Sequence, residues 1–275
     1  MMVTSQQFNR CRRMIATLSV TAMLTLGTDP AAAHEFWLDP IDFTPKVGAT
    51  VPIVHRIGIN FEGDTYPFVR KLSRRFSIVD AQGERAIKTI DGDDPAGEVK
   101  FSTAGLSIVV YQRVAEPTVF ATFEKFEENL KIEGLEWAID AHRQAGKRMT
   151  DIRELYARCA KALVSVGAGG GNDRAVGLPL EIIAELNPYK LNLGDPLPVR
   201  LLHTGKPVAG LLVKSFNRDD KESPRQARTD ADGRALMQVP MAGEVLISAV
   251  HMLPPGPKEQ VEWSSLWASL TFKRP

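Results

Sequence analysis

The chain has 275 residues, 44% of them hydrophobic and 24% charged, a composition that allows a buried core and excludes a disordered chain. Lysine and arginine number 34 and aspartate and glutamate 33, so the net charge of +1 lacks the basic excess typical of nucleic-acid-binding proteins. Two cysteines exclude a scaffold held together by many disulfides.

Residues 1–33 are typical of a secretory signal peptide. Three arginines precede an apolar run over residues 14–27, and Ala31–Ala33 places small residues where a signal peptidase cleaves. The apolar run is too short for a membrane-spanning helix, which needs about 20 residues. Cleavage after Ala33 would release a periplasmic chain that begins at His34 and has no membrane span. The general secretory and twin-arginine export routes both stay open.

Residues 34–120 are predicted to form a first β-sandwich-like unit, because short alternating runs are separated by turns. Residues 121–175 are predicted to be a helical segment with a glycine-rich connection. Apolar residues recur at helical spacing over 123–139, and Gly134 interrupts them. A further helix is expected over 151–166, since Asp151 and Glu154 have the capping-box spacing and apolar residues follow at intervals of three and four.

Residues 176–275 are predicted to form a C-terminal β-sandwich-like domain from several strand-length runs. Two patterns repeat between the β segments in the same order. A glycine precedes a strand at Gly48 and Gly194, and an Ala-Gly pair precedes a strand at residues 104–105 and 242–243. The fold class is therefore mainly β, with two sandwich units of immunoglobulin-like or transthyretin-like type and a helical insertion between them.

Histidines are the candidate metal ligands. Cleavage after Ala33 would make His34 the amino terminus, where its α-amine and imidazole can chelate one ion, as in the histidine brace that suits Cu(II) or Ni(II). His251 and His55 each lie on the apolar side of a predicted strand, and we expect them to complete the site. His203 is expected in a turn and His142 in solvent, so both are weaker candidates.

Several motifs together resemble a family of periplasmic domains of unknown function associated with nickel and cobalt uptake, described as nickel-transporter-like periplasmic components. The resemblance covers the whole mature chain. It implies a periplasmic protein that handles a divalent transition metal, with His34 and His251 at positions where family members have histidines. The motifs are His34-Glu35-Phe36-Trp37-Leu38, Glu154-x-Tyr156-x-Arg158-x-x-Lys161, Gly177-Leu178-Pro179-Leu180-Glu181, Thr229-Asp230-Ala231-Asp232-Gly233 and the run from Trp263 to Phe272.

The leading hypothesis is a non-enzymatic protein that binds nickel or cobalt and supports uptake by an inner-membrane permease. The sequence contains no Gly-x-Ser-x-Gly, His-Glu-x-x-His or Cys-x-x-Cys motif, so it has no signature of hydrolase, metalloprotease or dithiol chemistry. Two alternatives stay open. One is a copper-binding histidine-brace protein, acting as a carrier or an oxidative enzyme, and the other is a metal-free sandwich module that binds carbohydrate or protein.

Overall fold

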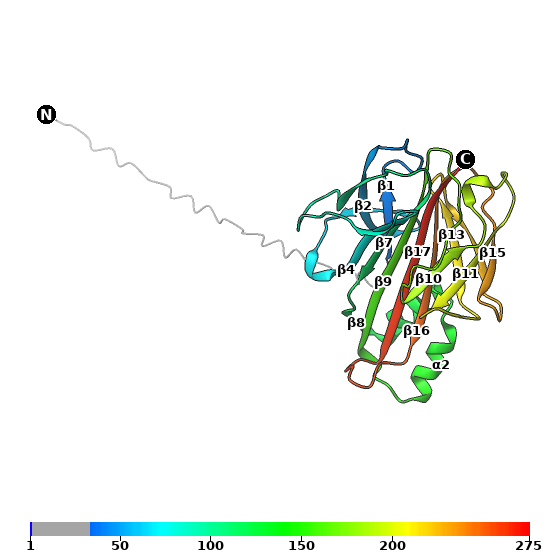
Figure 1. Cartoon of the computed structure of the whole chain (residues 1–275). Coiled ribbons are helices and arrows are strands. Elements are labelled where there is room, and N and C mark those ends of the chain that lie inside the picture. The colour runs from blue at the N-terminus through cyan, green and yellow to red at the C-terminus, as the bar shows by residue number, and fades with distance from the viewer. Residues whose placement is uncertain (2–33) are drawn as a thin grey trace.

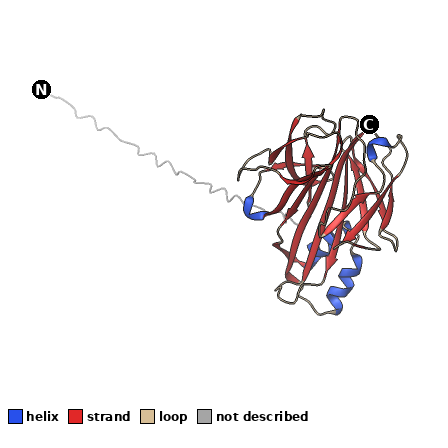
Figure 2. Ribbon diagram, in the orientation of Figure 1, coloured by secondary structure: helices blue, strands red, loops and turns tan. Residues whose placement is uncertain are grey.

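The computed structural model describes Met1 and residues 34–275, except for the side chains of residues 221–223. The predicted signal peptide lies outside the described residues. Most of the described chain is β-structure, arranged in three sheets, with two short α-helices (Figures 1 and 2). The mainly β prediction is therefore confirmed.

The largest sheet has nine strands and forms the central layer of the molecule. Its order is β14-β13-β16-β17-β9-β7-β4-β5, and β8 also pairs with β9. The strands are β4 (Ser73–Asp80), β5 (Gly83–Ala86), β7 (Gly105–Arg113), β8 (Glu116–Thr122), β9 (Thr150–Val166), β13 (Leu212–Asn217), β14 (Asp220–Arg228), β16 (Gly243–Leu253) and β17 (Trp263–Arg274).

Two four-stranded sheets pack on opposite faces of the central sheet. The N-terminal sheet consists of β1 (Glu35–Pro40), β2 (Thr50–Ile59), β3 (Glu62–Tyr66) and β6 (Gly97–Lys100). The C-terminal sheet consists of β10 (Leu180–Ala184), β11 (Leu197–His203), β12 (Lys206–Pro207) and β15 (Arg234–Met237). Side chains of β9 point alternately to the two faces of the central sheet. Ala160 and Ala162 pack in the core under the N-terminal sheet, whereas Cys159 and Leu163 pack in the core under the C-terminal sheet.

The two sandwiches share this central sheet. Strands from the first β segment and strands from the second belong to it together, because β9 pairs in parallel with β17 and antiparallel with β7. The two β segments are thus continuous through one sheet, where the sequence suggested a separate sandwich for each.

Helices α1 (Phe123–Ile132) and α2 (Glu136–Gln144) cover the end of the central sheet beyond the N-terminal sheet (Figure 1). The hydroxyl of Thr122 accepts a hydrogen bond from the Lys125 amide and caps α1. Gly134 separates the helices with φ +67°, and a Cβ there would lie 2.7 Å from Leu212. The predicted helical segment over 123–139 and its interruption are confirmed. Two 3₁₀ turns, Arg70–Leu72 and Pro188–Lys190, complete the elements.

The helix predicted over 151–166 is wrong, because this segment is the 17-residue strand β9. The residues that suggested a helix at 155, 159 and 163 also fit a strand, since a spacing of four keeps side chains on one face of either structure. β9 is flanked on both sides by other strands and is buried on both faces over much of its length. Such a strand has no polar face to show the period of two that identifies a strand in sequence.

Candidate functional site

His251 and His203 form a pair at one end of the C-terminal sandwich. His251 lies near the end of β16 in the central sheet, and His203 is the last residue of β11 in the C-terminal sheet. Their ring centroids are 5.0 Å apart and the rings are inclined at 72°. Burial, with the nearby His203 ring, lowers the pKa of His251 to about 4. The imidazole of His251 is therefore neutral at physiological pH, which is the form that binds a metal.

The spacing of the pair fits shared coordination of one ion. An ion about 2.0–2.1 Å from one nitrogen of each imidazole, at a roughly tetrahedral angle, holds two ring centroids about 5 Å apart. The observed 5.0 Å agrees with that value. His203 also lines a cavity of about 300 Å³ beside the pair. Other residues that line it are Ala115, Leu155, Ala157, Leu253, Glu259 and Leu266.

The sequence assigned His203 to a turn, and the structure places it at the end of a strand. A signal was present, because His203 follows Leu197, Val199 and Leu201 at intervals of two, and those three residues are buried in the core. The same alternation places His251 after Ile247 and Ala249. Both histidines thus extend an apolar strand face past the point where the core ends.

His55 lies in a different place, inside the core between the N-terminal sheet and the central sheet. It is fully buried, and its ring centroid is 4.4 Å from that of Tyr111, 5.0 Å from Phe76 and 5.2 Å from Phe36. Burial, with the charge of Arg113, lowers the pKa of His55 to about 3. Within the described residues neither ring nitrogen has a hydrogen-bond partner. Of these three neighbouring rings, those of Phe36 and Phe76 carry no ligating atom, and that of Tyr111 carries one hydroxyl.

His34 lies on the same face of the central sheet as His55, just before β1. Its backbone carbonyl accepts a hydrogen bond of 3.3 Å from Nη2 of Arg158 on β9. Arg158 shares its face of β9 with Ala160, which packs under the N-terminal sheet, whereas His251 shares its face of β16 with Ala249 in the other core. The central sheet therefore separates His251 from His34 and His55, and the structure does not bring the three predicted ligands together.

Two further observations bear on these histidines. In the part of the chain that the structure describes, no three histidine, cysteine or acidic side chains are grouped so that they could hold a metal. His142, which was expected in solvent, is fully buried, and its two ring nitrogens contact the Arg148 carbonyl at 2.7 Å and the Trp263 indole N–H at 3.0 Å. His142 is thus part of the core beneath the helices.

Several of the motif residues meet on the face of the central sheet between β1 and the helices. Glu154 on β9 is fully buried and accepts a hydrogen bond from the hydroxyl of Ser265 on β17, which in turn accepts one of 2.9 Å from the Trp267 indole. Burial raises the pKa of Glu154 to about 7, against the lowering effect of the Ser265 hydroxyl. Glu35 contributes a second polar group on this face, 3.5 Å from Lys214, which also contacts Glu133 at 2.8 Å.

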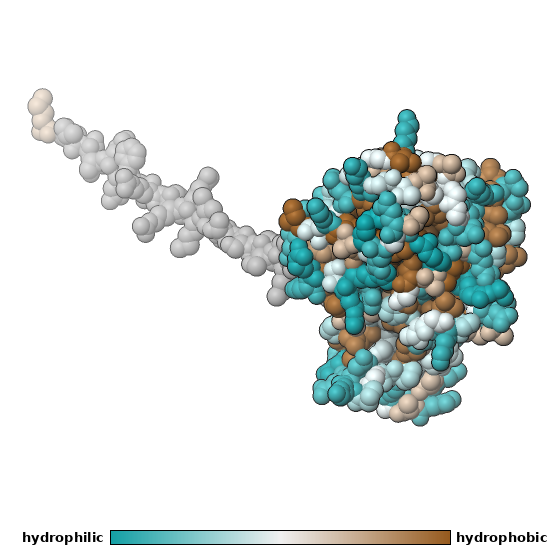
Figure 3. Space-filling model, in the orientation of Figure 1, coloured by the Kyte–Doolittle hydropathy of each residue, from teal (hydrophilic) through white to brown (hydrophobic). Residues whose placement is uncertain are grey.

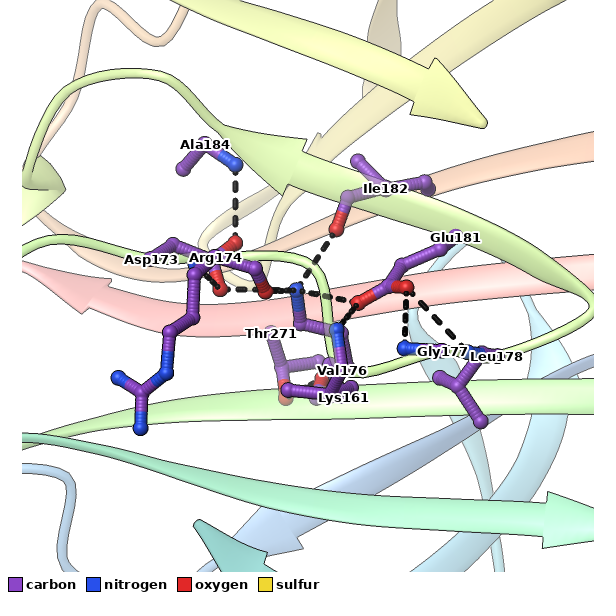
Figure 4. Close-up of polar contacts among 10 residues, drawn as sticks. All are labelled: Lys161, Asp173, Arg174, Val176, Gly177, Leu178, Glu181, Ile182, Ala184 and Thr271. Carbon is purple, nitrogen blue, oxygen red and sulfur yellow. Dashed lines mark hydrogen bonds and ion pairs between the residues drawn. The ribbon is translucent and has the colours of Figure 1, made fainter. Parts of the chain in front are cut away.

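Two other motif residues meet in the core on the opposite face. Lys161 of β9 and Glu181 of β10 are buried with Asp173 (Figure 4). The Lys161 ammonium lies 2.8 Å from Asp173 and 3.2 Å from Glu181, and it donates to the carbonyls of Arg174 and Ile182. Backbone N–H groups of Val176, Gly177, Leu178, Arg174 and Ala184 donate to the two carboxylates. This cluster holds the segment that follows the glycine-rich turn against the central sheet.

The surface is mixed in polarity, and hydrophilic and hydrophobic residues alternate over the face seen in Figure 3. Among the described residues, the helices are all too short or too polar to cross a membrane.

Comparison with models of protein families assigns the chain to one of them. The model of a domain of unknown function, DUF4198, matches residues 31–253. The chain belongs to the DUF4198 family. The expectation of an uncharacterised domain family is confirmed in that form. No curated protein matches the chain.

The similarities to solved structures are distant. A tetra-tandem repeat from the extending region of a large adhesion protein has 10% identity and a TM-score of 0.23, with 88% of this chain and 49% of that chain covered. The D0-D1 domain of intimin has 14% identity and a TM-score of 0.20, with 86% and 97% covered. The chain thus spans about half of the adhesion-protein structure.

Proposed function

We propose that this protein binds a divalent transition metal, with nickel or cobalt as the first candidates, through His251 and His203. The observation that carries the proposal is the 5.0 Å separation of the two imidazole rings. Neutral imidazole is a good ligand for nickel, cobalt, copper and zinc, and two such ligands from rigid strands are held ready for an ion. The sequence resemblance to proteins of nickel and cobalt uptake adds support for the metal class.

The arrangement favours a site that exchanges its metal. Two protein ligands leave coordination positions for water or for a ligand from a partner, unlike a closed structural site with four protein ligands. A protein that passes metal to an inner-membrane permease needs such open positions. Export through a cleaved signal peptide, with the mature chain in the periplasm, belongs to the same proposal.

His34 is less suited to hold the metal than the sequence suggested. A divalent cation on its amine and imidazole would lie close to the Arg158 guanidinium, which donates to the His34 carbonyl at 3.3 Å. Arg158 is only 2% exposed, so water would screen this repulsion weakly. The same argument weakens the histidine-brace alternative with copper at His34.

Metal binding can be measured at controlled free concentrations of Ni(II), Co(II), Cu(II) and Zn(II) on the chain that begins at His34. We expect His251→Ala and His203→Ala each to weaken binding at least tenfold, because each removes a direct ligand. Lys206→Ala, on the exposed strand β12 next to His203, is the matched control and should bind as the unmodified chain does. Equal affinity in both histidine variants and the control would reject the site.

The order of affinities then separates the metals. Copper binds most nitrogen sites more tightly than nickel, so the comparison must use buffered free metal and not total metal. Unchanged affinity after one residue is added before His34 would show that the terminal amine is not a ligand, which we expect. A strong loss of metal affinity in that extended chain would instead identify His34 as a ligand.

A further inference from the structure

The cavity beside His203 lies past the end of the core between the central sheet and the C-terminal sheet. Strands β16, β17 and β9 lie side by side in the central sheet (Figure 1). Their register places Ala249, Ala268 and Cys159 in one row across the three strands, and all three residues are buried in the core. The strands continue beyond this row, and the next residues on the same face form the floor of the cavity.

Two further rows of residues make up this floor and its edge. From β16 through β17 to β9, the first row is His251, Leu266 and Ala157, and the second row is Leu253, Ser264 and Leu155. Each of the six is half-buried, and all except His251 line the cavity. Four of them are apolar, so an apolar group that covers the floor removes hydrophobic surface from water, which favours binding.

The two histidines lie at the edge of this floor. His251 begins the first row, and the ring of His203, which lines the cavity, is 5.0 Å from the ring of His251. A metal held by both imidazoles is therefore adjacent to the floor. A molecule that reaches the free coordination positions of this metal can also contact Leu266, the neighbour of His251 in the first row.

The described residues give such a metal no third protein ligand. No three histidine, cysteine or acidic side chains among them are grouped so that they could hold an ion. Of the described residues that line the cavity, Glu259 alone is acidic, and its Oε2 accepts hydrogen bonds from the Gly256 amide at 2.7 Å and the Ser264 hydroxyl at 2.6 Å. Transition metals in proteins have about four or more coordination positions, so the remaining donors come from outside this part of the chain.

We propose that the cavity binds the apolar group of a small bidentate chelator, whose donor atoms complete the coordination of the metal held by His203 and His251. This inference rests on the proposed metal-binding function. An α-amino acid with an aliphatic side chain has the required form, because its amine and carboxylate chelate the metal while its side chain covers the floor. The volume of about 300 Å³ is at the lower end of the range of about 300–1,000 Å³ for ligand pockets.

The charges at the cavity agree with such a complex. A divalent metal brings two positive charges to the two neutral imidazoles. The carboxylate of the chelator balances one of them, and the Glu259 carboxylate at the cavity supplies a second negative charge. A free organic anion without the metal would instead meet the negative charge of Glu259. The arrangement therefore favours the chelator in its metal-bound form.

Glycine and L-leucine are matched probes, because both chelate a metal through the same amine and carboxylate and differ only in the side chain. Ni(II) binding to the chain that begins at His34 is measured by equilibrium dialysis while either amino acid is titrated. A metal buffer holds free Ni(II) constant, below half-saturation of the chain, so competition by the amino acid for the metal does not change the result. We expect both to raise the bound Ni(II), with L-leucine effective at a concentration at least tenfold lower than glycine.

Ala157→Leu tests the floor without changing either histidine. The larger side chain occupies the place next to Leu266, so the advantage of L-leucine over glycine should disappear while Ni(II) binding without amino acid stays the same. Ala121→Leu adds the same side chain at an exposed position of β8 and is the matched control, which should keep the advantage. Leu253→Ala removes part of the floor and provides a second variant in case Ala157→Leu does not fold; it should reduce the advantage.

The outcomes separate this inference from the metal proposal. If the chain binds Ni(II) through His203 and His251 but L-leucine and glycine act at equal concentrations, the cavity does not bind the chelator and the metal site stands. An advantage of L-leucine that persists in Ala157→Leu and Leu253→Ala, or L-leucine binding of equal affinity to the metal-free chain, would also overturn the inference. Absence of Ni(II) binding with and without the amino acids would reject the metal site and this inference together.

Discussion

Replacing Lys161 by methionine tests the buried cluster of Figure 4. The substitution keeps an unbranched side chain of similar length and removes the ammonium group that lies 2.8 Å from Asp173 and 3.2 Å from Glu181. Both carboxylates are almost completely buried, at 0% and 2% side-chain exposure. The variant would therefore leave two negative charges in the core without their cation.

The size of the effect follows from these contacts. Removing one partner of a buried ion pair destabilises a protein by about 3–5 kcal/mol. Five backbone N–H groups donate to the two carboxylates and remain in the variant, so we expect the lower end of that range. A loss of about 3 kcal/mol lowers the melting temperature of a domain of this size by about 6–12 °C.

The pH dependence makes the test specific. Burial raises the pKa of Asp173 against the lowering effect of Lys161, so without the lysine this pKa rises further. A carboxyl whose pKa is higher in the folded state binds protons preferentially there, and the fold becomes less stable as pH rises through that pKa. The deficit of Lys161→Met should therefore be smaller at pH 5 than at pH 8.

Urea denaturation at pH 5, 7 and 8 measures this deficit as the change in the free energy of unfolding. Lys131→Met is the control, because Lys131 is 59% exposed and its ion pair with Glu127 contributes less than about 0.5 kcal/mol. A deficit below 1 kcal/mol at pH 7, or one that grows on acidification, would refute the reasoning.

Three other substitutions have defined outcomes. Gly134→Ala should lower the free energy of unfolding by about 1–3 kcal/mol in urea titrations, because φ is +67° there and the new methyl group would meet Leu212 at 2.7 Å; unchanged stability would show that the backbone relaxes. In the unmodified chain, a pKa of about 3 keeps the buried His55 ring neutral, while the unfolded chain binds a proton below pH 6.5, so the free energy of unfolding falls by about 2 kcal/mol between pH 8 and pH 5. His55→Phe should remove this loss; a variant with the unmodified chain's pH dependence would contradict this. Ser265→Ala removes the hydroxyl that binds Glu154 and should raise the pKa of that carboxyl above about 7, which carboxyl-labelled NMR titration can follow; a lower value would be inconsistent with the assignment.

The helices could be predicted from sequence because their signals are local. The apolar spacing over 123–139 and the break at Gly134 involve neighbouring residues alone, and both are present in α1 and α2. Strand β9 could not be predicted from sequence. Its 17 residues have apolar side chains on both faces over the second half and a capping-box spacing at the start. Its pairing with β17 joins residues more than 100 positions apart, and that long-range pairing overrides the local helical preference.

In the candidate site, too, some features follow from the sequence and others only from the tertiary structure. The sequence by itself determined that the chain has a core of β-strands, that His251 ends an apolar strand face, and which motifs carry the family resemblance. It could not show that His203 and His251 approach to 5.0 Å, because they belong to different sheets. Nor could it show that the central sheet separates His251 from His34, since the face of a strand is known only relative to the layers that pack on it. Alternation along a strand assigns side chains to two faces, and the tertiary structure alone decides what lies on each.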